Sequence, residues 1–468
     1  MKRGTIHLYK IKAYDYPKPD LLYELIDEFI MPNQYKLYEK GIDIDEDIID
    51  LTSARHGKSK DCIKREIYKK LSGITGIYPD WGILTGVRPV KLCGELIEKY
   101  DSDAFVKRVL TDEYLISDDK ANMIIDMYKY QVSLFSKAKP DSLGLYIGIP
   151  FCPTRCLYCS FASNQSEYDV IERYLDALIQ EIESIGIMLK KSDYGIESLY
   201  IGGGTPTSLD ERQLNRLLTA IENNFNVDGL KEYTIEAGRP DTINKEKLSI
   251  IRAFGCDRIS INPQSMKAKT LELIGRSHTP GEIETAFETA CKLGFNSINA
   301  DLIAGLPNEN LDDFILSLDK ILKLGADNIT VHSLAIKRAS RLREQDPEFH
   351  YKQSKVTNEM TEKGYNILIE QGFRTYYLYR QKHMAGAGEN IGYCKDDKAA
   401  LYNIRIMDEH QSILALGAGA ISKRYFSKEN RLERIPNVTN VEHYIKRIDE
   451  MIKRKANLFF DQEGEYIC

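Results

Sequence analysis

The chain contains 468 residues, of which 43% are hydrophobic and 29% charged, and its formal net charge is -6. These values are typical of a globular protein of roughly two or three domains. The acidic balance argues against wholesale nucleic-acid binding, because neutralising phosphate groups requires a basic excess. No apolar run reaches the roughly 20 residues that cross a bilayer, and the N-terminus lacks an apolar segment of signal-peptide length. We therefore expect a cytoplasmic monomer with neither a membrane nor a nucleic-acid partner.

Residues 1–138 predict a mixed α/β domain whose last element is a helix over residues 120–137. Its most distinctive phrase is LTGVRPVK at residues 84–91, in which Pro89 suits the first turn of a helix. Two interpretations of this phrase stay open. It is either a helix entry with solvated cations, or an anion-binding helix N-terminus to which Arg88 and Lys91 add positive charge.

Residues 139–340 alternate between short β-rich runs and amphipathic helical patterns, such as the apolar spacing over residues 170–185. Strands are expected at residues 145–150, 198–203, 232–237, 257–262, 297–303 and 328–334. Successive βα units with right-handed crossovers predict an α/β fold, a partial (β/α)6 barrel with its site at the carboxyl ends of the strands. Residues 341–468 predict a C-terminal α+β extension that covers the substrate.

Three cysteines, Cys152, Cys156 and Cys159, directly follow the first expected strand. A fully protein-ligated iron–sulfur cluster needs four cysteines, so this triplet predicts a [4Fe-4S] cluster with one iron open to a small molecule. A structural zinc site would need a second cysteine or histidine pair. The other cysteines show no such pairing: Cys62, Cys93, Cys256, Cys291, Cys394 and Cys468. Free thiols and an exposed cluster both indicate a reducing, low-oxygen (anaerobic) environment.

Polar residues and glycines follow the later strands of the expected barrel. The run Gly202–Gly204 would let a ligand approach the backbone, and Glu236 suits a ribose hydroxyl or a ligand ammonium group. Gln264, Arg276 and Asp301 occupy similar positions further along the chain. Each acid alone is more often a helix cap or a solvated charge. Together, at the ends of consecutive strands, these groups predict a ligand site.

The arrangement resembles the radical SAM superfamily and, over residues 140–425, the oxygen-independent coproporphyrinogen III oxidase (coproporphyrinogen dehydrogenase) group. The shared phrases are YIGIPFC at 146–152, GGGTPT at 202–207, RISINPQ at 258–264, DLIAGLP at 301–307 and LGAGA at 416–420. The phrases TGVRP at 85–89 and EAGRP at 236–240 are most similar to the HemZ subgroup.

The resemblance implies that Cys152, Cys156 and Cys159 are the catalytic and metal-binding residues of a [4Fe-4S] cluster. It also implies one or two molecules of S-adenosylmethionine, an electron donor such as flavodoxin or ferredoxin, and a tetrapyrrole substrate. Contacts to the cluster-bound S-adenosylmethionine are implied for Tyr146, Gly203, Glu236 and Ala335, and Ile421 would reach back to this cofactor. A second S-adenosylmethionine site or the substrate cavity is implied for Tyr158, Gly204, Thr205, Gln264, Arg276 and Asp301.

Two departures from the group leave the substrate open. Phe161 replaces a further cysteine found in one branch, and Ser160 replaces an acidic residue of the haem-delivering branch. The first hypothesis is oxidative decarboxylation of coproporphyrinogen III propionates to vinyl groups in haem and porphyrin biosynthesis. The second is a haem carrier or chaperone related to HemW, with His332, His383 or Cys394 as an axial ligand. The third is a radical SAM enzyme that acts on another tetrapyrrole or on a methyl acceptor.

A tetracarboxylate substrate would need several cations around its binding site. Two short stretches after the sixth expected strand are rich in them. The candidates are Lys337, Arg338, Arg341, Arg343, Arg374, Arg380 and Lys382.

Overall fold

The computed structural model describes residues 8–12, 19–38, 48–51, 59–85, 88–159, 164–336, 340–381 and 388–460. Its main sheet has 11 strands in the order β10-β11-β9-β8-β7-β6-β5-β4-β12-β13-β14. The predicted six parallel strands form its centre. They are β4 (Ser142–Ile149), β5 (Gly195–Gly203), β6 (Glu232–Glu236), β7 (Arg258–Ser260), β8 (Ser297–Ala304) and β9 (Asn328–Ser333). The α/β fold with a partial barrel is therefore confirmed.

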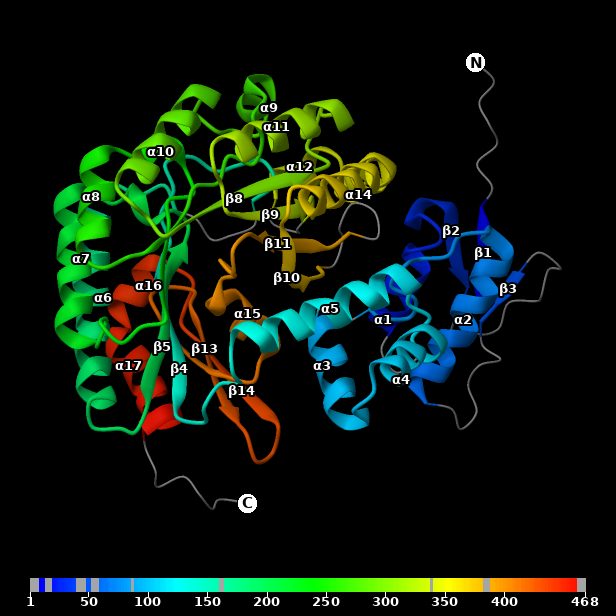
Figure 1. Cartoon of the computed structure of the whole chain (residues 1–468), viewed down its shortest axis with the longest axis horizontal. Coiled ribbons are helices and arrows are strands. Elements are labelled where there is room, and N and C mark those ends of the chain that lie inside the picture. The colour runs from blue at the N-terminus through cyan, green and yellow to red at the C-terminus, as the bar shows by residue number, and fades with distance from the viewer. Residues whose placement is uncertain are drawn as a thin grey trace.

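Helices between these strands cover the outer face of the curved sheet (Figure 1). They are α6 (Tyr168–Leu189), α7 (Glu211–Asn224), α8 (Lys245–Ala253), α9 (Ala268–Leu273), α10 (Pro280–Lys292) and α11 (Leu311–Lys323). Capping boxes start α7 at Asp210, α10 at Thr279 and α11 at Asn310. Each box satisfies backbone N–H groups that the first helical turn leaves without partners.

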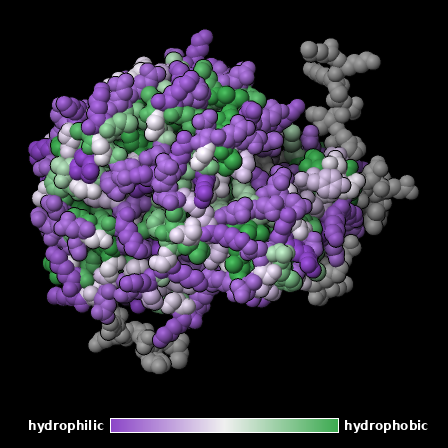
Figure 2. Space-filling model, in the orientation of Figure 1, coloured by the Kyte–Doolittle hydropathy of each residue, from purple (hydrophilic) through white to green (hydrophobic). Residues whose placement is uncertain are grey.

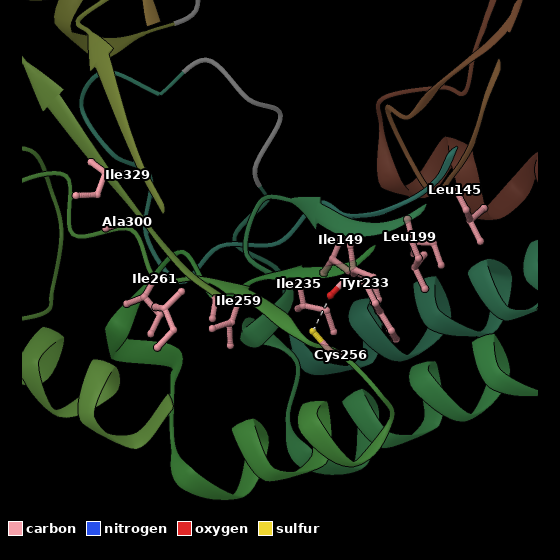
Figure 3. Close-up of a cluster of buried hydrophobic side chains, with 14 of the residues drawn as sticks. Leu145, Ile149, Leu199, Tyr233, Ile235, Cys256, Ile259, Ile261, Ala300 and Ile329 are labelled. Atoms are coloured by element: carbon pink, nitrogen blue, oxygen red, sulfur yellow. Dashed lines mark hydrogen bonds between the residues drawn. The ribbon is translucent and has the colours of Figure 1, made fainter. Parts of the chain in front are cut away.

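The strands alternate between an apolar outer face and a polar inner face. Leu145, Leu199, Ile235 and Ile259 are buried and point from the sheet toward the helices (Figure 3). The next residue along β4 is Tyr146, which faces the inside of the barrel. Because successive side chains of a strand point to opposite faces, one alternating pattern builds both the core and the wall of the interior.

Residues after 340 extend both edges of this sheet. Strand β12 (Ser412–Leu416) pairs in parallel with β4, and the antiparallel strands β13 (Ile421–Phe426) and β14 (Arg431–Pro436) follow it. At the other edge, β11 (Asn390–Cys394) joins β9 antiparallel and carries β10 (Arg374–Tyr379). The helices of this region are α12 (Arg341–Gln345), α13 (Phe349–Lys352), α14 (Ser354–Glu370), α15 (Leu401–Asp408), α16 (Val441–Lys446) and α17 (Ile448–Lys455).

The N-terminal region has a small parallel sheet of its own, in the order β2-β1-β3. Its strands are β1 (Tyr9–Lys12), β2 (Tyr35–Tyr38) and β3 (Ile48–Asp50), and its helices are α1 (Pro19–Asp27), α2 (Lys60–Thr75), α3 (Pro89–Tyr100), α4 (Asp103–Arg108) and α5 (Asp118–Leu134). In Figure 1 these blue and cyan elements lie beside the barrel, and α5 runs across toward it.

Short 3₁₀ or π turns complete the structure at η1 (Pro32–Gln34), η3 (Val109–Glu113), η4 (Pro206–Ser208), η5 (Pro240–Thr242) and η6 (Ala456–Phe460). The face of the molecule in Figure 2 is mainly hydrophilic, with apolar residues in scattered patches. No helix among the described residues is long and apolar enough to cross a membrane. The boundaries of the three expected domains stay predictions.

Candidate active site

A cavity of about 430 Å³ lies inside the partial barrel. This volume is within the range of small-molecule and cofactor sites. All but one of the residues expected to bind the cluster, S-adenosylmethionine or the substrate at the strand ends line it: Tyr146, Cys152, Cys156, Tyr158, Cys159, Gly203, Gly204, Thr205, Glu236, Gln264, Arg276, Asp301 and Ala335. Ile421 does not line the cavity, and at the start of β13 its side chain is 47% exposed. Its contact with a cofactor therefore stays a prediction.

The cysteine loop closes one side of the cavity. Cys156 is buried, whereas Cys152 and Cys159 are partly exposed. The backbone N–H of Leu157 donates to the Ile274 carbonyl at 2.9 Å, which ties the loop to the end of α9. Three thiols on one anchored loop thus face the same space.

Two guanidinium groups lie against this loop, one from the buried Arg239 and one from the half-buried Arg276. Arg239 Nη1 donates to the Thr154 carbonyl at 3.1 Å and lies 3.9 Å from Cys156 Sγ. Arg276 Nη2 donates to the Tyr158 hydroxyl at 3.2 Å. The loop therefore carries fixed positive charge beside the cysteines, and cysteine thiolates are the ligands of iron–sulfur clusters.

The donor set fits a cluster better than a single ion. No group of three or more His, Cys, Asp or Glu side chains within the described ranges converges closely enough to hold one metal ion. A cubane cluster binds each thiolate at a different iron atom, so its ligands stay farther apart than those of a zinc ion. The three thiols line the same cavity without converging on one point, which matches the wider ligand spacing of a cluster.

The glycine run at the end of β5 brings its backbone close to the segment that leads into the cysteine loop. Gly203 has φ +114°, and a Cβ there would lie 3.1 Å from the Ile149 carbonyl oxygen. A Cβ on Gly204 would lie 2.5 Å from the Phe151 carbonyl oxygen. These glycines are therefore required for the local backbone geometry as well as for an open cavity wall.

Glu236 ends β6 and forms part of a polar, aromatic wall. Tyr200 on β5 donates a hydrogen bond to Glu236 Oε1 at 2.6 Å. The rings of Tyr146, Tyr200 and Tyr402 stack, with centroids of Tyr200 and Tyr402 4.7 Å apart. Burial raises the pKa of Glu236 to about 7, against the effect of the Tyr200 hydrogen bond. The carboxyl group is thus poised to ionise near neutral pH.

At the far side of the cavity, His332 faces an oxygen atom at each ring nitrogen. Its Nε2 lies 3.5 Å from Asp301 Oδ2, and its Nδ1 lies 3.1 Å from Asn390 Oδ1. Burial alone would lower the pKa of His332, but the hydrogen bond and charge of Asp301 raise it. In return His332 lowers the pKa of Asp301, although burial opposes this effect. This geometry favours a doubly protonated His332.

Gln264 is held in a left-handed backbone conformation with φ +67°. Its N–H donates to the Asp301 carbonyl at 2.9 Å, and its own carbonyl accepts from the Ile303 N–H at 3.0 Å. These bonds to β8 hold a conformation that non-glycine residues rarely adopt. Non-glycine residues held in this left-handed conformation often occur at functional sites.

The sequence analysis missed several polar lining residues: Tyr200, Arg239, Ser260, Asn299, Thr330, Tyr377, Tyr379, Asn390, Tyr402 and Asn403. Those on the strands had a signal. Residues 297–301 (SINAD) and 328–332 (NITVH) alternate polar and apolar residues, whereas buried parallel strands are usually almost continuously apolar. Residues from β10, β11 and α15 had no such signal, because only the tertiary fold brings them to the barrel.

Those of the expected carboxylate-binding cations that the structure describes do not line this cavity. Arg341, Arg343, Arg374 and Arg380 are absent from its lining. Lys337, Arg338 and Lys382, like His383, lie outside the described residues. Cys394 is buried away from the cavity, 3.5 Å from the Tyr130 hydroxyl.

The two cations of the N-terminal phrase also have a partner. Arg88 Nη2 lies 3.1 Å from Glu409 Oε1, and Lys91 Nζ lies 3.6 Å from Glu409 Oε2. Arg88 precedes α3 and makes no side-chain cap. The ion pairs favour the interpretation as a helix entry, docked here against the end of α15, over that of an anion site.

Comparison with known proteins agrees with this geometry. Residues 146–321 match the radical SAM superfamily. The chain is 38% identical over 399 residues to the oxygen-independent coproporphyrinogen-III oxidase-like protein HemZ of Bacillus subtilis, which covers 83% of this chain and 79% of that protein. It is also 38% identical over 192 residues to the heme chaperone HemW of Bacillus subtilis, covering 41% of this chain and 50% of the chaperone.

A solved structure of coproporphyrinogen III oxidase (HemN) from Escherichia coli, described as a radical SAM enzyme, superimposes with a TM-score of 0.53. The superposition covers 69% of this chain and 72% of that protein at 23% identity. At this identity the likeness concerns the fold alone.

Proposed function

We propose that this chain, which belongs to the radical SAM superfamily and within it to the family of the oxygen-independent coproporphyrinogen-III oxidase-like protein HemZ, converts propionate side chains of coproporphyrinogen III to vinyl groups in porphyrin biosynthesis. The observation that carries the proposal is a cavity with two chemically distinct sides. The cysteine loop lies on one side, and His332 and Asn390 lie on the other. A cofactor and a second organic ligand can therefore lie side by side.

The superfamily implies a [4Fe-4S] cluster and S-adenosylmethionine. Cys152, Cys156 and Cys159 would hold the cluster. When bound, the two groups would supply the abstraction of a hydrogen atom from the propionate β-carbon, and a separate one-electron acceptor would take up the electron released when carbon dioxide leaves and the vinyl group forms. A flavodoxin or ferredoxin is the proposed source of the electron that cleaves S-adenosylmethionine.

The residues of the chain bind, orient and shield the reactants. Glu236, once ionised, offers a carboxylate to the ammonium group of S-adenosylmethionine, and the exposed edge of Gly203 and Gly204 offers backbone groups. The stacked tyrosines supply an apolar surface that excludes water. Excluding water and stray hydrogen donors protects a radical reaction, and orientation brings the β-carbon to the reacting atom.

A haem carrier is the second candidate, because the chain is also similar to heme chaperone HemW. The two axial-ligand candidates that the structure describes, His332 and Cys394, do not favour haem binding. His332 has both ring nitrogens directed at oxygen acceptors, and Cys394 does not line the cavity. An imidazole whose two nitrogens carry protons has no lone pair for iron. A radical enzyme for another tetrapyrrole would keep the cysteine loop and change only the far side of the cavity.

The deciding experiment is anaerobic incubation of the reduced, cluster-loaded protein with S-adenosylmethionine and coproporphyrinogen III. We expect 5′-deoxyadenosine, carbon dioxide and a vinyl product to rise together, one of each per propionate converted. The matched control is Cys156→Ala, which should give none of the three. Formation of 5′-deoxyadenosine at a rate indifferent to coproporphyrinogen, with no vinyl product and with stoichiometric haem binding, would favour the carrier.

A further inference from the structure

The N-terminal domain contacts the barrel through Trp81, the only tryptophan of the chain. Its side chain is fully buried, and its Nε1–H donates a hydrogen bond to Glu389 Oε2 at 2.8 Å. The ammonium group of Lys120, on α5, pairs with the other oxygen of the same carboxylate. Glu389 directly precedes β11, at the edge of the main sheet. Two residues from the N-terminal half thus hold one carboxylate of the C-terminal half.

Two cations lie near the indole ring. Lys120 Nζ lies 5.7 Å and the Arg380 guanidinium carbon 5.4 Å from the ring centroid. Arg380, which follows β10, also donates to Glu28 Oε1 at 2.9 Å and to the Leu84 carbonyl. Cation–π contacts and charge-assisted hydrogen bonds gain strength when they are shielded from water. We call Trp81, Lys120, Arg380 and Glu389 the interdomain clamp.

The interdomain clamp is continuous with the far wall of the cavity. The Glu389 carbonyl accepts a hydrogen bond from Ser333 Oγ at 2.9 Å. The next residue, Asn390, holds His332 Nδ1 at 3.1 Å and donates to the Tyr379 carbonyl at 3.2 Å. Ser333, His332, Tyr379 and Asn390 all line the cavity. Glu389 does not line it, so it can influence a ligand there only through these neighbours.

Glu389 is 6% exposed, so its charge has lost most of its hydration. A buried carboxylate is stable only while its donors stay in place, and removing one donor leaves an uncompensated charge. Partners in the N-terminal region, distant in sequence, therefore hold the start of β11 in place. Because β11 pairs antiparallel with β9, the relative positions of Asn390 and His332 depend on where β11 begins.

We propose that Glu389 is a positioning residue through which the N-terminal domain holds the His332–Asn390 wall in the geometry that receives the propionate-bearing ligand. The proposal rests on the function proposed above for the choice of ligand. It gives the N-terminal domain a role in the site although none of its described residues lines the cavity. S-adenosylmethionine, bound beside the cysteine loop that follows β4, lies across the barrel from β9 and β11 and should not sense the interdomain clamp.

The test compares Trp81→Phe with the wild-type protein in its cluster-loaded form. Phenylalanine keeps an aromatic ring near the cations but removes the N–H donor. Amide hydrogen exchange over β11 should become about tenfold faster, as expected for the loss of one hydrogen bond to a charged group, while exchange over β4 and β5 stays unchanged. The KM for coproporphyrinogen III should rise several-fold, and the affinity for S-adenosylmethionine should stay within twofold.

Tyr351→Phe is the matched control. It removes a different hydrogen bond between the N-terminal domain and the C-terminal region, from Tyr351 to Asp27 Oδ2 at 3.4 Å, and neither residue lines the cavity. This variant should leave exchange over β11 and the KM unchanged. Lys120→Met is a second variant that weakens the interdomain clamp without altering Trp81, and it should reproduce the effects of Trp81→Phe.

Unchanged exchange over β11 in both clamp variants would overturn the proposal, and so would an equal loss of affinity for both ligands. Should no variant and no wild-type preparation convert coproporphyrinogen, the proposed function fails. The exchange comparison still decides whether the N-terminal domain holds this wall, because it needs no substrate.

Discussion

Tyr200 and Glu236 form a hydrogen bond of 2.6 Å across neighbouring strands at the centre of the cavity wall. Both residues are half-buried in the cavity wall, and desolvation raises the pKa of Glu236 to about 7. The group that would bind a ligand ammonium thus changes its charge within the physiological pH range.

Affinity for S-adenosylmethionine should increase as the pH rises through about 7, because only the ionised Glu236 attracts an ammonium group. Glu236→Gln should bind more weakly at pH 8 and lose most of this pH dependence. Equilibrium binding of the ligand at several pH values measures the effect. An unchanged pH profile in the variant would show that Glu236 does not bind this group.

The same titration has the opposite effect on stability. The folded protein holds the Glu236 proton more tightly than the unfolded chain does, since the pKa rises from 4.5 to about 7 on folding. This contribution to the free energy of unfolding is present below pH 4.5 and is lost as the pH rises through about 7. The wild type should therefore lose stability relative to Glu236→Gln as the pH rises over this range, as measured in denaturant titrations.

Gly204→Ala should disturb the cysteine loop. Its Cβ would lie 2.5 Å from the Phe151 carbonyl oxygen, next to Cys152, so the backbone must shift. Overpacking of this kind costs about 1–3 kcal/mol in unfolding free energy, and iron content after reconstitution should fall. Gly195→Ala, at the start of the same strand, meets nothing within 4 Å and is the matched control. Equal melting temperatures and iron contents for the two variants would contradict this account.

Replacing any of Cys152, Cys156 and Cys159 by Ala should abolish cluster iron while the chain stays folded. Cys256 serves as the control: it is buried outside the cavity, and its Sγ donates to the carbonyls of Tyr233 and Arg258. Cys256→Ala should keep its iron. Iron analysis and circular dichroism distinguish the two groups, and an equal iron loss in the control would disprove the ligand assignment.

Asp301→Asn should lower the pKa of His332, because Asp301 raises it through a hydrogen bond and its charge. The ring signals of His332, identified by their absence in His332→Ala, report this pKa in a magnetic resonance titration. The expected sign is a loss of the imidazolium at a lower pH than in the wild type. An unchanged midpoint would mean that Asp301 and His332 do not interact as they do here.

Glu181 and Lys455 form an ion pair in which both side chains are fully enclosed. Lys455→Met would leave the Glu181 carboxylate buried without its cation, at a cost of about 3–5 kcal/mol in unfolding free energy. The neighbouring Arg454 pairs with Glu450 at the surface, so Arg454→Met should cost less than about 1 kcal/mol. Chemical denaturation of the two variants measures the contrast. Similar losses in both would show that the buried pair is not essential.

Local patterns in the sequence determined much of this protein. The spacing of Cys152, Cys156 and Cys159 predicted the cluster loop, and the alternation of strands with amphipathic helices predicted the partial barrel. Such signals are readable because helical and strand periodicity, turn chemistry and ligand spacing act over a few residues. The polar inner face of the barrel also has such a local signal, because polar and apolar residues alternate at 297–301.

Only the tertiary structure decided which distant segments complete the site. Tyr402 stacks on Tyr200, Arg239 lies against Cys156, and Trp81 holds Glu389 beside the cavity wall. The tertiary structure also places Arg380 against Trp81 and Glu28. From the sequence, Arg380 was expected to bind a carboxylate of the substrate. These contacts join residues tens to hundreds of positions apart. They depend on strand order and side-chain packing in three dimensions, which no short-range periodicity of the chain encodes.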